Sequence, residues 1–286
     1  MKQINNKMKY CIIGILSILI VYIVLICFNN NKLITFNNEF GEVDYLKEEN
    51  IIEDVVKPKS FEYNVPIFMY HFILDDYGKN TDVENFLSPD KLEKQLKYIK
   101  ENGFETIYIR DFDELYKYKK PVALTFDDCF VYFYNNAYPL FKKYNLKASI
   151  YVITDYINGE NYLTTEQLIE MKNSGLIDIQ SHSISHRKLT TISFKEAKNE
   201  VINSKLKLKE LCGVYSNVFC YPVGDYNSKV VDVVKENYSF CLNMLGGMYN
   251  SSKHSRYNIP RIYANRSMSM NEYISYLNKS KVITNY

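Results

Sequence analysis

The sequence lacks a marked excess of charge of either sign. Its 35 lysine and arginine residues nearly balance 33 acidic residues, which leaves a formal net charge of +2. The lysine-rich stretch at 205–209 has acidic neighbours and is typical of a solvated helix face. Proteins that bind nucleic acid usually present a basic stripe. The composition therefore gives no reason to expect a nucleic acid partner, and no internal repeat or low-complexity tract is present.

Histidine and cysteine are scarce, which limits the metal sites that the chain can build. There are four histidines and six cysteines, and Cys11 and Cys27 lie in an apolar N-terminal run. The other four cysteines have no metal-type spacing, and the sequence leaves open whether any pair forms a disulfide; they are Cys129, Cys212, Cys220 and Cys241. Cys220 and Cys241 fall in predicted strands, where free cysteine commonly serves as a small core residue.

The run at 11–28 contains no charged residue, and lysines at positions 2, 7 and 9 precede it. About 18 residues is near the lower limit for a membrane-spanning helix. Basic residues before the run favour a cytoplasmic N-terminus with the rest of the chain outside. A cleaved signal peptide, followed by secretion, is the alternative. The run is longer than an ordinary signal core, however, and no small-residue cleavage site follows it.

The segment after this run is polar and acid-rich, which predicts a stalk. The predicted organisation is therefore a cytoplasmic N-terminus at 1–10, a transmembrane signal-anchor at 11–28, an extracellular stalk at 29–60 and a folded domain at 61–286. This arrangement places the protein in the cell membrane with its folded domain outside.

Strand-like and helix-like segments alternate through the folded domain. The expected strands are 67–70, 122–126, 148–153, 177–180, 218–221, 240–243 and 259–262. The expected helices are 89–102, 134–144, 165–173, 193–211 and 228–237. Regular alternation of this kind indicates a parallel sheet. By itself, the pattern does not separate an open sheet from a barrel.

Two motifs carry the chemistry. Asp127 and Asp128 follow the strand-like run 122–126, and His182 and His186 follow another apolar run. Adjacent carboxylates at a strand end point to opposite sides of the pleat, so one can bind a metal while the other remains a general base. A carboxylate and two imidazoles leave coordination positions open for water and substrate. Because both motifs lie at strand C-termini, where α/β folds place ligand sites, they predict metal-assisted hydrolysis.

At these residues the chain resembles the polysaccharide deacetylases (carbohydrate esterase family 4, the NodB-type domain). Thr-Phe-Asp-Asp at 125–128 and His-Ser-Ile-Ser-His at 182–186 are similar to the first two motifs of that family. Further similar stretches follow at 65–71, 88–96, 102–104, 219–226 and 259–261, so the resemblance covers about residues 63 to 280. The Met-Tyr-His, Tyr-Pro-x-Gly-Asp-Tyr and Pro-Arg elements are most like the branch that deacetylates extracellular poly-N-acetylglucosamine.

The resemblance implies a distorted (β/α) barrel of about seven strands with the motifs at strand C-termini. It implies an N-deacetylase that acts on N-acetylglucosamine units of an extracellular polysaccharide. Deacetylation of peptidoglycan is the main alternative, and O-acetyl esterase activity on another glycan is a further one. A non-catalytic glycan-binding protein is the alternative from a different functional class.

The resemblance also implies the roles of site residues. Asp128, His182 and His186 would hold a divalent metal, with Zn²⁺ expected and Co²⁺, Ni²⁺ or Mn²⁺ as alternatives. Asp127 would be the general base, and the backbone N–H of Val223 would be the second oxyanion donor.

Three departures from the family pattern affect this assignment. Cys220 replaces the usual arginine of the third motif, so Arg261 is expected to orient the base and lower its pKa. No late Leu-x-His motif follows Arg261, so His71 is expected to be the general acid, with His254 as the alternative. Cys129 stands where the family usually has glycine. If that position needs a positive φ, cysteine costs on the order of 1 kcal/mol there.

Tryptophan is absent, whereas tyrosine occurs 27 times. Sugar rings stack on aromatic faces, and Tyr70, Tyr221 and Tyr226 lie close to the motifs in the sequence. These three tyrosines are therefore the predicted substrate-binding residues, although aromatic content does not identify the sugar.

Overall fold

A computed structural model describes residues 60–75 and 85–285 of the chain. The predicted cytoplasmic N-terminus and membrane anchor, and the predicted stalk apart from Ser60, lie outside these residues. Within the described part of the chain, no helix has the length and hydropathy needed to cross a membrane.

Seven parallel strands form a closed barrel in the order β2-β12-β10-β9-β8-β7-β6, and the pairing of β6 with β2 closes it. Their bounds are β2 Ile67–Tyr70, β6 Pro121–Phe126, β7 Ala148–Val152, β8 Ile177–Ser181, β9 Val218–Cys220, β10 Phe240–Gly246 and β12 Ile259–Tyr263. The short strand β5 (Glu105–Thr106) pairs with the start of β6. The predicted (β/α) barrel is confirmed. Because the sheet is closed, the architecture is a barrel and not the open sheet that the alternation of segments also allowed.

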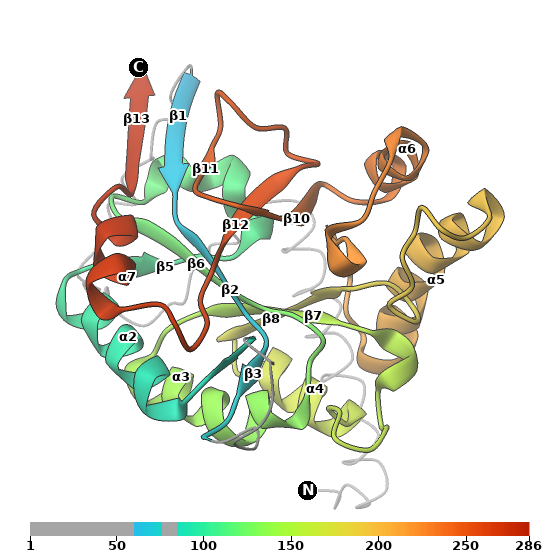
Figure 1. Cartoon of the computed structure of the whole chain (residues 1–286), viewed down its shortest axis with the longest axis horizontal. Helices are drawn as coiled ribbons and strands as arrows, with labels where there is room; N and C mark the ends of the chain where they lie inside the picture. Colours follow the sequence, from blue (N-terminus) through green and yellow to red (C-terminus); the bar gives the residue numbers. More distant parts are fainter. Residues whose placement is uncertain (1–59, 76–84, 286) are drawn as a thin grey trace, which may run out of the picture. The chain divides into compact units, whose positions relative to one another are not determined.

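Helices surround the barrel (Figure 1). They are α2 Pro89–Glu101, α3 Tyr138–Tyr144, α4 Thr165–Asn173, α5 Phe194–Cys212, α6 Ser228–Asn237 and α7 Met270–Leu277. Shorter helical turns are η1 Ile109–Lys117, η2 Phe133–Ala137, η3 Thr154–Tyr156 and η4 Pro222–Gly224. Capping boxes begin α4 at Thr164 and α5 at Ser193: the side chain of each N-cap residue accepts the backbone N–H of the third helical residue, whose side chain accepts the N-cap backbone N–H in return. The helix α7 was not among the expected helices.

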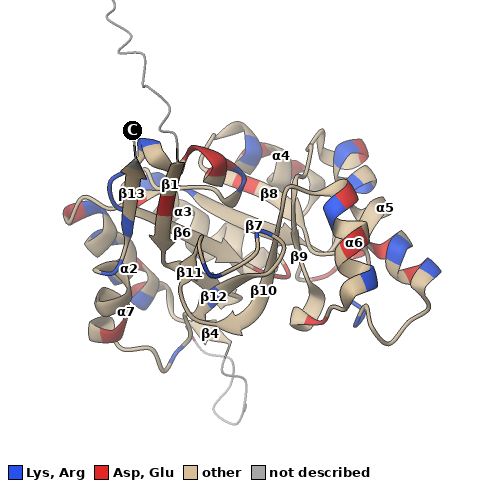
Figure 2. Ribbon diagram, turned by 90° about the horizontal axis from the view of Figure 1, so that it is seen from above, with Lys and Arg blue, Asp and Glu red and all other residues tan. Residues whose placement is uncertain are grey.

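Strand residues alternate between the helical layer and the barrel interior. Phe68 and Tyr70 of β2 pack in the outer hydrophobic cluster, whereas Ile67 packs inside the barrel. Because both faces are covered, the barrel strands read as nearly continuous apolar runs. Charged side chains lie mainly on the outer helices, where lysine and acidic residues are interspersed (Figure 2).

Two small sheets complete the domain. β1 (Ser60–Val65) pairs antiparallel with β11 (Tyr249–Asn250) and with β13 (Lys281–Asn285). The last described strand therefore lies directly beside the first. β3 (Phe72–Ile73) pairs with β4 (Phe86–Leu87). Cys129, Cys212, Cys220 and Cys241 are buried and free, so the described chain contains no disulfide.

Candidate active site

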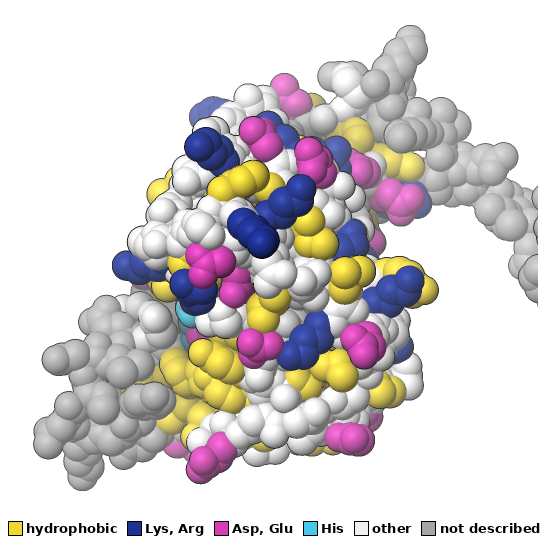
Figure 3. Space-filling view, turned by 90° about the vertical axis from the view of Figure 1, so that its right-hand side faces the viewer, with side chains coloured by type: hydrophobic (Ala, Val, Ile, Leu, Met, Phe, Trp, Pro, Cys, Tyr) yellow, Lys and Arg dark blue, Asp and Glu magenta, His cyan; other side chains and the backbone are white. Residues whose placement is uncertain are grey.

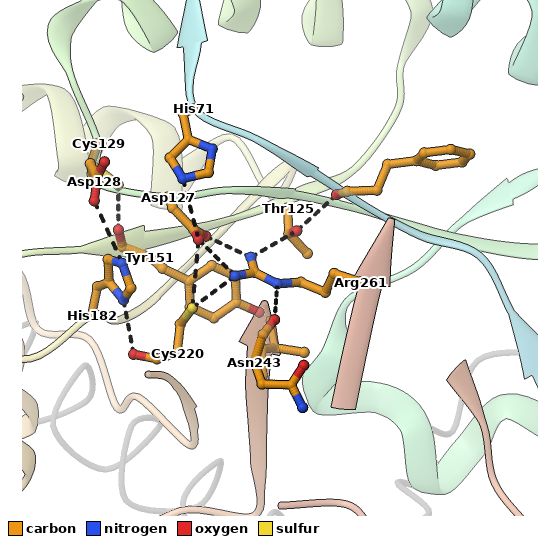
Figure 4. Close-up of polar contacts among 12 residues, drawn as sticks. His71, Thr125, Asp127, Asp128, Cys129, Tyr151, His182, Cys220, Asn243 and Arg261 are labelled. Atoms are coloured by element: carbon orange, nitrogen blue, oxygen red, sulfur yellow. Dashed lines mark hydrogen bonds and ion pairs between the residues drawn. The ribbon is translucent and has the colours of Figure 1, made fainter. Parts of the chain in front are cut away.

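Most polar residues of the site follow barrel strands at one rim. Asp127 and Asp128 follow β6, His182 follows β8, and Arg261 lies in the middle of β12. His71 directly follows β2. Parallel strands bring their carboxyl ends to the same rim, so residues far apart in sequence converge there (Figure 4).

Asp127 and Arg261 form a fully buried pair. The guanidinium Nη1 and Nη2 each donate to one carboxylate oxygen at 2.7 Å, and the two side chains are 1% and 0% exposed. Arg261 Nε also donates to the carbonyl of Asn243 at 3.0 Å. Burial alone would raise the pKa of Asp127, but the arginine charge and its hydrogen bonds outweigh burial and hold the pKa well below its ordinary value. Asp127 therefore stays ionised and fixed in orientation.

Asp128, His182 and His186 place one ligand atom each within 4.8 Å of one another. Asp128 Oδ1 lies 3.5 Å from His182 Nε2 and 3.4 Å from His186 Nε2. This oxygen is buried and has no hydrogen-bond partner among the described residues. A buried polar atom without a partner is costly, and a cation between the three side chains would remove that cost.

The protonation of the two imidazoles also suits a metal. His182 Nδ1 lies 2.8 Å from the carbonyl of Cys220, which can only accept, so Nδ1 carries the proton and the Nε2 lone pair faces Asp128. Burial lowers the pKa of His182 to about 3 and also lowers the pKa of His186. Both rings are thus neutral at pH 7, as metal ligands must be. The donor set fits a divalent cation such as Zn²⁺.

The backbone at the rim is locally strained. Positive φ angles occur at Asp128 (66°), Cys129 (60°), Ser183 (67°), His186 (59°) and Val223 (50°), none of which is glycine. Such conformations cluster at functional sites, where the surrounding structure holds them. The position of Cys129 does need a positive φ, which glycine would adopt without strain and cysteine does not.

The turn with Val223 lies over the end of β9. Gly224 has a φ of 67°, and a Cβ added there would lie 2.9 Å from the Cβ of Met244. Glycine is therefore required for the close approach of this turn to β10. The Val223 side chain is 44% exposed.

Of the two candidate general acids, the structure brings only His71 to the base. His71 Nε2 lies 4.0 Å from Asp127 Oδ2, and the histidine side chain is 10% exposed. His254 instead accepts a hydrogen bond from the Asn250 N–H and stacks on Tyr249. Tyr249 belongs to β11, which pairs with β1. Because β1 leads into the start of β2 and His71 follows its end, His254 lies at the opposite end of β2 from His71.

The predicted sugar contacts of Tyr70 and Tyr221 are wrong. Their side chains are 1% and 0% exposed, and each packs in a hydrophobic cluster outside the barrel. Tyr226 is half-buried, stacks on Tyr221 and donates to Asn258 Oδ1 at 2.8 Å. Tyr263, which was not among the predicted substrate-binding residues, is 37% exposed at the end of β12. The spacing in the sequence could have indicated it, because residues two apart on a strand share a face and Tyr263 follows Arg261 by two.

The site is only partly open to the surface. Side-chain exposure is 3% for His182, 16% for Asp128 and 26% for His186. In the face shown in Figure 3, a histidine is visible only as a small area between neighbouring side chains, beside a hydrophobic region. A ligand would therefore approach the cluster from the side of His186.

Comparison with known proteins identifies relatives for this arrangement. The family model described as polysaccharide deacetylase matches residues 116–238. The Bacillus subtilis protein YxkH, named as a polysaccharide deacetylase, is 30% identical over 223 residues, which cover 76% of this chain and 77% of YxkH. The poly-beta-1,6-N-acetyl-D-glucosamine N-deacetylase of Staphylococcus aureus is 27% identical over 218 residues, with 68% of this chain and 73% of that protein covered.

A solved structure agrees with these sequence matches. The Streptococcus pyogenes deacetylase PplD in complex with acetate superposes with a TM-score of 0.70 at 28% identity. The superposition covers 77% of this chain and 99% of PplD. The similarity therefore extends over nearly all of that solved chain and is not confined to the motifs.

Proposed function

The chain belongs to the polysaccharide deacetylase family and is a deacetylating hydrolase, and from this premise we propose that it removes N-acetyl groups from N-acetylglucosamine units of an extracellular polysaccharide. The observation that carries the chemistry is the juxtaposition of two carboxylates with different partners. Asp127 is held by Arg261, whereas Asp128 faces His182 and His186. One carboxylate is thereby free to move a proton while the other contributes to a cation site.

Asp128, His182 and His186 would hold the divalent cation, for which Zn²⁺ is the expected ion. When bound, the cation supplies Lewis-acid polarisation of the acetyl carbonyl. An acetamide is a poor electrophile, so the protein must also activate water and protonate the leaving amine. Asp127 accepts the proton of the attacking water, and Arg261 keeps its carboxylate oriented for that transfer.

Two further groups complete the proposed reaction. The backbone N–H of Val223 donates to the oxygen that gains negative charge in the transition state. His71, beside Asp127, donates a proton to the leaving amine nitrogen. Tyr226 and Tyr263 remain as aromatic residues that can contact the sugar, because each has an accessible part.

The name of the Staphylococcus aureus relative supports poly-N-acetylglucosamine over peptidoglycan as the substrate. We propose a membrane anchor at 11–28, an extracellular catalytic domain at 61–286 and a stalk between them, with secretion after signal cleavage as the alternative. Each deacetylation exposes an amine and adds positive charge to the polymer, which would alter its adhesion.

The decisive experiment measures acetate release by the full-length chain in detergent from poly-N-acetylglucosamine and from peptidoglycan. Chelation should abolish release, and Zn²⁺ should restore it. His182→Ala should lose both Zn²⁺ binding and turnover, whereas exposed Lys198→Ala should retain both. Release from peptidoglycan alone would reassign the substrate. No release from either polymer by a chain that binds Zn²⁺ would indicate another acetylated glycan or a binding role.

A further inference from the structure

The loop that follows β8 carries both histidines of the proposed metal site in a conformation that needs support. Ser183 and His186 have φ angles of 67° and 59°, and neither is glycine. Left-handed conformations of such residues are strained and persist only where the surroundings hold them. A hydrogen bond within the loop gives part of this support, because the His186 N–H donates to Ser183 Oγ at 3.0 Å.

The principal support comes from Glu200, which lies on α5 rather than on the loop. Its Oε2 accepts the backbone N–H groups of Ile184 and Ser185, both at 2.9 Å. Its Oε1 accepts the Ser185 hydroxyl. Ile184 and Ser185 lie between the two histidines, so one carboxylate holds the turn that separates the metal-ligand candidates.

The environment of Glu200 differs from that of an ordinary surface carboxylate on a helix. Glu200 is only 6% exposed, and it forms no ion pair with a described lysine or arginine. A buried carboxylate is costly unless hydrogen bonds compensate it, and here the compensation comes from the loop itself. Glu200 therefore holds the ligand loop through hydrogen bonds that in turn stabilise its own buried charge.

A second carboxylate holds the other end of the loop. Asp225, in the turn after β9, accepts the N–H of Thr190 at 2.8 Å and also its hydroxyl. The loop is thus fixed from α5 on one side and from the Val223 turn on the other.

We propose that Glu200 is a positioning residue of the metal site, which sets the spacing of His182 Nε2 and His186 Nε2 about Asp128 by holding the Ile184 and Ser185 amides. This inference rests on the metal role proposed above. Groups that orient metal ligands commonly change metal affinity by about 10- to 100-fold when removed. A residue that only stabilised the fold would instead change the unfolding temperature of the metal-free protein.

The test compares Zn²⁺ affinity across variants of the full-length chain, measured by competition with a chromophoric chelator. Glu200→Ala removes all three hydrogen bonds and should weaken Zn²⁺ binding by about 10- to 100-fold. Glu200→Gln can still accept both amides through its carbonyl oxygen while Ser185 accepts from its amide group, so it should recover most of the affinity. Glu210→Gln makes the same change at an exposed position of α5 and should bind Zn²⁺ as the unsubstituted chain does.

Thermal unfolding in excess chelator shows whether each variant is folded. A folded Glu200→Ala with unchanged Zn²⁺ affinity would overturn the proposal. If this variant does not fold, Glu200→Asp keeps the charge but is one methylene too short to reach both amides, and it should bind Zn²⁺ more weakly than Glu200→Gln. Equal affinity of the Asp variant and the unsubstituted chain would also overturn it. Absence of Zn²⁺ binding by the unsubstituted chain would refute the proposed metal site itself.

Discussion

Arg261 and Asp127 meet inside the barrel through two parallel hydrogen bonds of 2.7 Å, although the two residues lie 134 positions apart in the chain. The pair also contacts Cys220, whose Sγ lies 3.1 Å from Arg261 Nη2. The cysteine leaves room for an arginine that arrives from β12 instead of from the third motif. Because the pair is fully desolvated, neither partner can be removed without consequences for the other.

Asp127→Asn should lose turnover by about 10²- to 10⁴-fold while retaining Zn²⁺, because the base is removed and the proposed ligands are not. It should also lower the free energy of unfolding by about 3–5 kcal/mol, since the Arg261 charge stays buried without a counter-ion. Acetate release, Zn²⁺ affinity and urea unfolding check these outcomes. The double variant Asp127→Asn/Arg261→Met is the matched control and should regain stability without regaining turnover. Full activity of the single variant would contradict the role of Asp127.

His71→Asn should reduce the rate of acetate release by about 10²- to 10⁴-fold, as expected for loss of a general acid beside the base. His254→Asn should leave the rate unchanged, because His254 contacts Asn250 and Tyr249 at the other end of the barrel. Steady-state kinetics at saturating substrate distinguish the two variants. A larger loss from the His254 variant would reverse the assignment.

Cys129→Gly should be about 1 kcal/mol more stable than Cys129→Ala, because only glycine adopts a φ of 60° without a steric penalty. Both variants lose the thiol that donates to the Tyr151 carbonyl at 3.0 Å, so this loss cancels in the comparison. Chemical unfolding of the two variants gives the difference directly. Cys241, whose φ is not positive, is the control, and there alanine should be the more stable replacement. An advantage for alanine at position 129 would show that the strain is absent.

The raised pKa of the buried Asp178 carboxyl group predicts that the stability of the protein depends on pH. Asp178 is 3% exposed near the start of β8, where Arg110 lies 2.7 Å from its carboxylate. Burial raises its pKa from 3.8 to about 6 despite this arginine. The folded state thus binds the proton more tightly than the unfolded state, so this group's contribution to stability decreases as pH rises from about 4 to 6.

Asp178→Asn should consequently be more stable than the unsubstituted chain at pH 8, by up to about 3 kcal/mol. The gain should shrink toward zero near pH 4, where the carboxyl group is largely protonated in the folded protein. Urea unfolding of both proteins at pH 4, 6 and 8 measures this difference. A gain that did not vary with pH would contradict the raised pKa.

Local sequence predicted much of the architecture and the polar half of the site. The alternation of segments predicted the parallel strands, and α4 and α6 match their expected ranges. Capping signals explain this success, because they are local interactions between neighbouring residues. The helix α7 was not predicted because it is only eight residues long, and short amphipathic segments carry little periodic signal. Residue type and strand-end position sufficed to select Asp127, Asp128, His182 and His186.

The amino-acid sequence by itself determined which chemical groups stand at the carboxyl ends of strands, because those groups directly follow apolar runs. Tertiary structure decided which groups meet. Barrel closure brings His71 to Asp127 and leaves His254 at the other end, and helix packing buries Tyr70 while Tyr263 stays accessible. Glu200 reaches the histidine loop only because α5 packs beside it. Strand alternation separates two sets of side chains, but only the closed barrel and its helical cover determine which set faces the site.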